Sequence, residues 1–67
     1  MKIDFKFALG FDVLIRRNGI VGVVRIAAAD RRGRQRFYVQ YADGGGMIHE
    51  KWFDADDLEN VTAADAA

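Results

Sequence analysis

The turn signals of this chain divide it into short runs of the kind that form β-strands. Asn18-Gly19, residues 30–34 and residues 43–46 separate segments rich in Val, Ile, Phe, Tyr and Trp. Gly, Asn and Asp at such places permit the tight turns that join antiparallel strands. The spacing therefore predicts a small, strongly bent β-barrel.

The size and composition of the chain limit what this barrel can be. We expect one domain over residues 1–61, with residues 1–10 as an extended N-terminal arm and residues 62–67 as a disordered tail. The chain has no Cys and one His, so disulfides and an ordinary structural zinc site are excluded, and we expect no metal and no cofactor. A domain this small often gains stability by oligomerising, which makes a homo-oligomer an expectation. No run is apolar enough to span a membrane and the start does not read as a signal peptide, so we expect a cytoplasmic protein.

Charge is unevenly distributed although the formal total is zero. Residues 13–40 contain seven arginines against Asp30 alone, whereas residues 41–67 contain Lys51 against seven acidic side chains. Two interpretations follow. The two halves neutralise each other in the fold, or the basic half presents a surface for phosphate groups.

The first hairpin is predicted from residues 13–17 and 20–28, which flank Asn18-Gly19. A two-residue turn would pair Leu14 with Val23 and Asp12 with Arg25, an opposite-charge pair. The same register predicts a core face made of Phe11, Val13, Ile15, Val24 and Ile26. It leaves an apolar outer face that we predict as a self-association patch, made of Leu14, Val21 and Val23.

The second hairpin is predicted from residues 36–42 and 47–53. A symmetric four-residue loop would pair Tyr38 with Lys51, Gln40 with His49 and Val39 with Glu50. This register assigns Phe37, Tyr41 and Trp52 to the core, but it also turns Glu50 inward, where an unpaired carboxylate is costly. Glu50 therefore lies at the barrel rim, pairs with an arginine, or marks a register shifted by a bulge. We expect residues 54–57 to form a helical turn capped by Asp54, and residues 58–61 to form the last strand.

Two short motifs carry a resemblance to a known class of folds. They are Phe7-Ala8-Leu9-Gly10-Phe11-Asp12-Val13 near the start and Trp52-Phe53-Asp54-Ala55-Asp56-Asp57-Leu58-Glu59 near the end. Over residues 7–59 the chain resembles the SH3-like barrels of bacteria and phages, although Phe11 interrupts their usual Gly-Asp pair. The resemblance implies an all-β, five-stranded SH3-like barrel, a fold shared with Tudor and KOW binding modules.

One enzyme family, the type II dihydrofolate reductases, also resembles this chain in length and in its closing segment. The resemblance implies catalysis through a Val-Gln-Ile-Tyr run just before that segment. The matching positions keep none of these four residues, since they hold His49, Glu50, Lys51 and Trp52. We therefore expect no enzyme, and this activity stays a remote alternative.

Residues 30–36 carry a functional signal of composition, four arginines around Gly33, without a recognised motif. Arginine side chains bind phosphate oxygens in a bidentate manner, and a nearby tyrosine offers a surface on which bases stack. We predict a non-enzymatic binding module that contacts a nucleic-acid backbone or an acidic protein surface. No nucleophile–base set or phosphate-binding loop is visible, so we expect no small-molecule substrate. The alternative is a protein–protein or self-assembly module that uses the apolar patch. The predicted binding residues are Arg31, Arg32, Arg34, Arg36, Tyr38 and Lys51.

Overall fold

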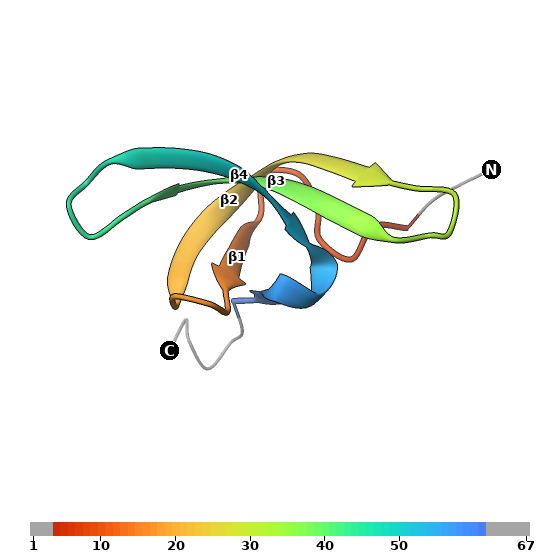
Figure 1. Cartoon of the computed structure of the whole chain (residues 1–67), viewed down its shortest axis with the longest axis horizontal. Helices are drawn as coiled ribbons and strands as arrows, with labels where there is room; N and C mark the ends of the chain where they lie inside the picture. The colour runs from red at the N-terminus through yellow and green to blue at the C-terminus, as the bar shows by residue number, and fades with distance from the viewer. Residues whose placement is uncertain (1–3, 62–67) are drawn as a thin grey trace.

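The computed structural model describes residues 4–61 as a single antiparallel sheet of five strands (Figure 1). Its elements are β1 (Asp12–Ile15), β2 (Ile20–Ala29), β3 (Gln35–Ala42), β4 (Ile48–Asp54), a 3-10 helix η1 (Ala55–Asp57) and β5 (Leu58–Asn60). The strand order is β4-β3-β2-β1-β5, so β4 and β5 are the two edges and no ladder joins them. The all-β prediction is confirmed. The tail predicted at residues 62–67 and the first residues of the arm lie outside the described residues.

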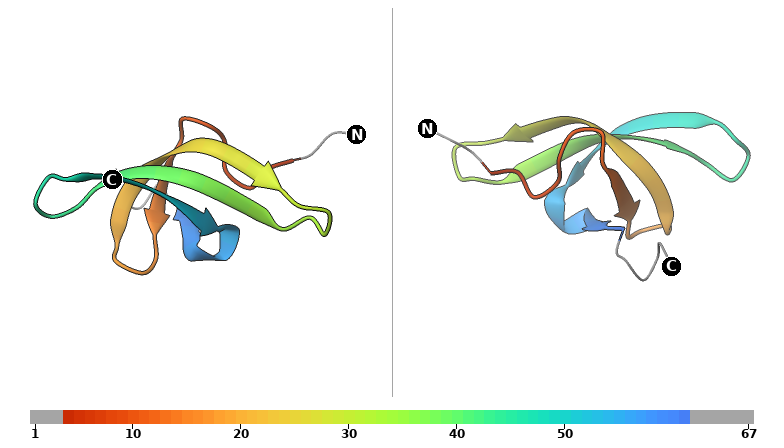
Figure 2. Two further views of the ribbon diagram at one scale, coloured as in Figure 1. Left: turned by 45° about the horizontal axis from the view of Figure 1, so that its top comes forward. Right: turned by 180° about the vertical axis from the view of Figure 1, so that it is seen from behind.

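The core lies on the concave side of this bent sheet. Figure 2 shows the long strands β2 and β3 arching over β1, β5 and η1. Eight hydrophobic side chains of the described residues are buried there, and no polar or charged side chain of that range is buried with them. They are Phe7, Val13, Ile15, Val24, Phe37, Val39, Tyr41 and Leu58.

The first hairpin has a longer loop than the sequence predicts. Residues 16–19 form a four-residue loop, closed by the Gly19 N–H donating to the Ile15 carbonyl at 2.8 Å. Asp12 consequently pairs with Val23 and Leu14 with Val21. The predicted register is wrong by two residues, and the Asp12–Arg25 pair does not form. A shift of two keeps every side chain on its face, which is why Val13, Ile15 and Val24 are buried as predicted.

A β-bulge in β2 reverses the two faces of that strand. Val24 pairs with Val39 and Ile26 pairs with Tyr38, so Arg25 is an extra residue between two ladder pairs. Beyond the bulge Ile26 points outward and is 47% exposed, while Ala27 packs against the core. The prediction that Ile26 belongs to the core is therefore wrong.

The N-terminal arm fills the core place predicted for Phe11. Phe7 is buried with its ring edge-on to Phe37, at a centroid distance of 5.1 Å. The chain then turns over residues 8–11, where Gly10 has a φ of 82° and its N–H donates to the Val24 carbonyl. Phe11 comes out of this turn largely exposed, so its assignment to the core is wrong.

Gly22 lies in β2 close to side-chain and backbone atoms of β3. A Cβ atom there would come within 2.6 Å of Val39 Cγ1 and 2.8 Å of the Gln40 carbonyl oxygen. The sequence predicts a bend or bulge for this mid-strand glycine. The bulge falls instead at Arg25, and Gly22 serves the close contact between strands.

The second hairpin is shifted by one residue relative to the prediction. Its loop has five residues, 43–47, so Tyr41 pairs with His49, Gln40 with Glu50 and Tyr38 with Trp52. A one-residue shift moves every β4 side chain to the other face. Glu50 therefore points outward, which makes the register shift the correct explanation of this residue. Trp52, predicted in the core, is 48% exposed, and Phe53 packs against the core instead.

Candidate functional site

The arginine-rich loop, residues 30–34, has a backbone fixed by its first residue. Asp30 Oδ1 accepts hydrogen bonds from the Arg32 and Arg34 N–H groups, both at 2.9 Å. The Gly33 N–H donates to the Asp30 carbonyl at 3.1 Å, and Gly33 has a positive φ, 82°. The arginine side chains take no part in these bonds and are exposed. The loop thus presents them on a tight turn that other residues build.

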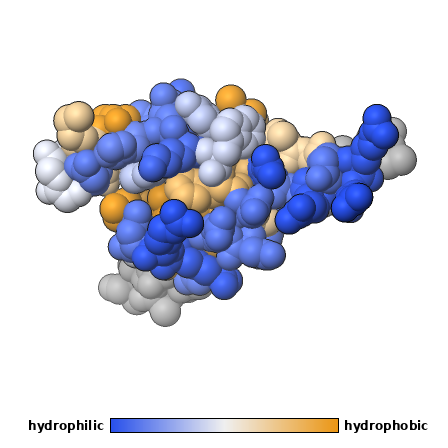
Figure 3. Space-filling view, viewed as in Figure 1, coloured by the Kyte–Doolittle hydropathy of each residue, from blue (hydrophilic) through white to orange (hydrophobic). Residues whose placement is uncertain are grey.

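The loop lies at one end of the molecule's longest axis, opposite the loop of residues 43–47 (Figure 1). In Figure 3 this end is strongly hydrophilic, whereas the opposite end has a mixed surface. The cationic side chains of the loop are therefore displayed away from the body of the sheet.

The basic and acidic halves of the chain neutralise each other only in part. Arg16 Nε lies 3.2 Å from Glu59 Oε2, and Arg36 Nε lies 3.3 Å from Asp54 Oδ1. Both pairs are exposed, so each contributes little to stability. Within residues 4–61, the other five arginines of residues 13–40 have no carboxylate oxygen within 4.0 Å. They are Arg17, Arg25, Arg31, Arg32 and Arg34.

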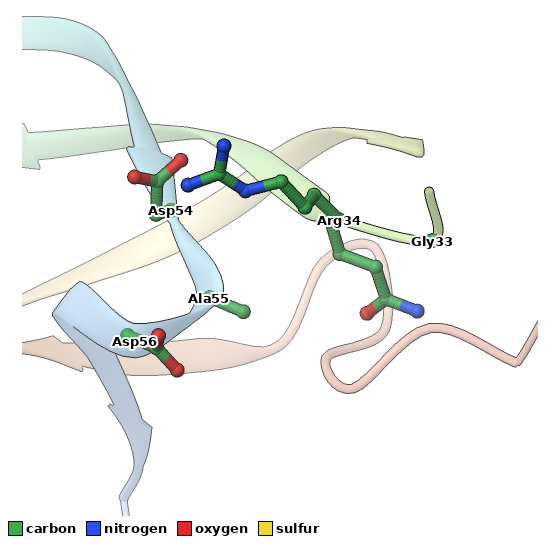
Figure 4. A pocket seen from close by; sticks show the side chains of 6 residues that line it. Gly33, Arg34, Asp54, Ala55 and Asp56 are labelled. Carbon is green, nitrogen blue, oxygen red and sulfur yellow. The ribbon is translucent and has the colours of Figure 1, made fainter. Parts of the chain in front are cut away.

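A shallow cleft of about 250 Å³ separates the arginine-rich loop from η1. Figure 4 shows Arg34 and Asp54 pointing toward one another from its two sides, with Asp56 below them. Asp54 occupies the N-cap position of η1, but its side chain makes no capping hydrogen bond and pairs with Arg36. The capping prediction is therefore wrong. Because the cleft carries charges of both signs, it offers no strong net field to an anion.

The sheet face turned away from the core, here called the outer face, carries an aromatic pair made of the half-buried Tyr38 and the exposed Trp52. The rings of Tyr38 and Trp52 lie 5.2 Å apart between centroids, on the neighbouring strands β3 and β4. Arg36 is two residues from Tyr38 on β3 and so shares this face. Lys51 pairs with Val39 and lies on the other face. The structure thus brings Tyr38 and Arg36 together with Trp52, which the wrong register hid from the sequence prediction, and separates them from Lys51.

The three residues of the predicted self-association patch share the outer face. Leu14 pairs with Val21, and Val23 lies next along β2. Val21 and Val23 line a shallow groove of about 330 Å³ together with Ile48, which is 60% exposed, and with the charged residues Asp12 and Arg25. The apolar surface is therefore wider than the sequence predicts, because the register shift of β4 adds Ile48 to it.

The loop of residues 43–47 holds a small polar cluster. His49 Nε2 lies 2.7 Å from Asp43 Oδ2, and the imidazole stacks on the Tyr41 ring at 5.3 Å. The hydrogen bond from His49, followed by those from the Met47 and Gly45 N–H groups, holds the pKa of Asp43 below its usual value. His49, predicted to lie opposite Gln40, thus belongs to the face that carries Tyr41.

Comparison with known proteins finds no matching family model, no matching curated protein and no matching solved structure. Across residues 4–61 no group of three or more His, Cys, Asp and Glu side chains is arranged to hold a metal ion. None of the helical structure in that range is long and apolar enough to cross a membrane.

Proposed function

We propose that this protein is a non-enzymatic module that binds the phosphate backbone of nucleic acid through the arginine-rich loop. The observation that carries the proposal is the loop itself. Its backbone is held by Asp30 and Gly33, while Arg31 and Arg32 are exposed at its tip without a carboxylate partner among the described residues. Unneutralised guanidinium groups on a fixed turn suit phosphate oxygens, which accept bidentate hydrogen bonds.

The strand arrangement supports a place for this module among the SH3-like barrels. Its order β4-β3-β2-β1-β5 and the 3-10 helix before the last strand agree with the resemblance drawn from residues 7–59. A shared fold does not by itself imply a shared function, since one small barrel fold hosts many activities.

The salt dependence of binding tests the proposal. Replacing Arg31→Gln and Arg32→Gln together should weaken binding and lower the slope of log affinity against log salt by about two, because each phosphate contact contributes about one. The matched control compares Arg31→Gln alone with Arg17→Gln, because both arginines are exposed hairpin-loop residues without a carboxylate partner among the described residues. Equal losses in these two single variants would show a diffuse charge effect and contradict a site in the arginine-rich loop.

A second candidate function is self-assembly through the outer face. Leu14, Val21 and Val23 adjoin the groove that Ile48 extends, and exposed contiguous apolar surface marks interaction sites. Val21→Lys and Ile48→Lys, made together, should reduce the solution mass measured by light scattering to that of one chain. Met47→Lys is the control, because Met47 is 66% exposed but lies in the loop of residues 43–47, outside the groove. An unchanged mass in the double variant would exclude this surface as an interface.

A further inference from the structure

We infer that the nucleic acid bound by this module is single-stranded, and that its unpaired bases stack on the Tyr38–Trp52 pair. This inference rests on the proposed function and names its ligand class. The two rings are in contact, yet Trp52 remains 48% exposed on an open sheet face. An aromatic pair with one exposed ring on an open face suits base stacking, because every base has a π-face and such stacking tolerates any sequence.

The position of the pair favours a nucleic acid over other ligands for aromatic rings. Arg36 adjoins Trp52 at a shallow pocket that also includes Asp54. On the other side, the bulge at Arg25 places an arginine in β2 beside Ile26, the residue that pairs with Tyr38. The arginine-rich loop continues from the same end of β3. Arginine residues thus adjoin the aromatic pair on β3 and occur on the neighbouring strand β2, and cationic side chains beside a stacking surface suit a nucleic acid with phosphates between its bases.

The acidic neighbours limit the path that such a strand can take. Glu50 pairs with Gln40 on the outer face, two residues from Trp52, and Asp54 is engaged by Arg36. Phosphate groups would be repelled along the Glu50 side. The bound nucleic acid therefore runs from the arginine-rich loop past Arg36 and Tyr38 toward Arg25. Gln40 offers its side-chain amide to a base edge.

The bases of a single strand can stack on the two rings, whereas the paired bases of a duplex cannot. In a duplex the bases are stacked on one another and their faces are closed to protein side chains, so the aromatic pair adds nothing to duplex binding. The loop arginines contact the backbone of either form. Single strands should therefore bind more tightly than a duplex of equal length, and only they should reach the rings.

Trp52 is the single tryptophan of the chain and reports directly on this contact. Adding a single DNA or RNA strand should quench its fluorescence, and a matched duplex should not. Tyr38→Leu and Trp52→Leu should each weaken single-strand binding by about 5- to 150-fold, as expected for one lost base stack, and leave duplex binding unchanged. Phe11→Leu is the matched control, since it removes an exposed aromatic ring that precedes β1, a strand with no ladder to β3 or β4.

The outcomes separate this inference from the function on which it rests. Salt-dependent binding of both forms with no change in Trp52 emission would overturn the stacking site and leave the backbone-binding proposal standing. Absence of binding to any strand would overturn both. Glu50→Gln provides a further readout, because removing the repulsion should strengthen single-strand binding. If Trp52→Leu does not fold, the quenching of the unaltered protein and the Tyr38→Leu variant decide the question.

Discussion

The two five-residue hairpin loops, residues 30–34 and 43–47, share one pattern of backbone hydrogen bonds but differ in charge, because only the first carries arginines. In each, the first residue is an aspartate whose Oδ1 accepts the N–H groups of the third and fifth residues, at 2.9 to 3.0 Å. In each, the fourth residue is a glycine with positive φ whose N–H donates to the aspartate carbonyl. The remaining positions are arginines in one loop and Gly44, Gly45 and Met47 in the other.

The difference shows which residues build a loop and which are left for another purpose. Gly44 and Gly45 do not have positive φ, and a side chain at Gly44 would meet no atom within 4 Å. The corresponding positions in the other loop hold Arg31 and Arg32 without any change of design. The turn therefore does not require arginine at positions 31 and 32, which is consistent with a role of these side chains in binding.

The largest expected effect comes from the two glycines that the shared design requires. Gly33→Ala and Gly46→Ala each place a Cβ atom in the left-handed region, at a cost of about 1–2 kcal/mol. In a domain of this size each kilocalorie lowers the Tm by roughly 4–8 °C. Thermal denaturation followed by circular dichroism measures both. A loss at one glycine without a similar loss at the other would break the equivalence of the two loops.

The aspartates come next. Asp30→Ala and Asp43→Ala each remove the acceptor of two backbone N–H groups, so both should lower the Tm, by less than the glycine variants because the freed N–H groups are exposed to water. Asp43→Ala should cost more than Asp30→Ala, since Asp43 also binds His49. The opposite order would show that the His49 contact does not stabilise the fold.

The two loops should also differ in how their contribution to stability depends on pH. The pKa of Asp43 is lowered in the folded protein, chiefly by the hydrogen bond from His49. Its ionised form therefore contributes stability above the unfolded-state pKa of about 4, and that stability is lost as the pH falls through the folded-state value. His49→Ala should move this loss to higher pH, which Tm measurements between neutral and strongly acidic buffer would detect. An acid limb at the same pH in the variant would contradict the assignment.

The smallest expected effect is the exchange of side chains between loops. Gly44→Arg and Gly45→Arg together should change the free energy of unfolding by no more than about 0.5 kcal/mol, because neither position requires glycine. Denaturant unfolding provides the measurement. A larger destabilisation would mean that glycine at these positions serves the fold and would weaken the comparison with Arg31 and Arg32.

Strand positions could be predicted from the sequence because turn residues and apolar runs are local signals. Five strands and the helical turn after Asp54 lie where the pattern places them. Register could not be predicted in the same way, since it depends on loop length. An Asp-x-x-Gly-x loop closes with five residues through the side chain of its aspartate, a count that the glycine run at 44–46 conceals.

The two register errors had unequal consequences for the candidate site. The first hairpin is shifted by two, so Val13, Ile15 and Val24 keep the core face and the patch of Leu14, Val21 and Val23 keeps its side. The second was shifted by one, so Trp52 was assigned to the core and Lys51 to the binding face. The arginine-rich loop can be found from composition alone. The position of Trp52 beside Tyr38 can be found only from the correct pairing of β3 with β4.

The bulge at Arg25 means that β2 contains one residue more than its ladder with β3 needs. Val24 and Ile26 already pair with the consecutive residues Val39 and Tyr38, so a chain without Arg25 would form a regular ladder with Ile26 still outward and Ala27 still inward. Removal of a paired residue such as Val23 would instead move Val24 from the core face to the outer face. The chain should therefore tolerate deletion of Arg25 far better than deletion of Val23, a contrast that a library of single deletions across residues 20–29 would reveal.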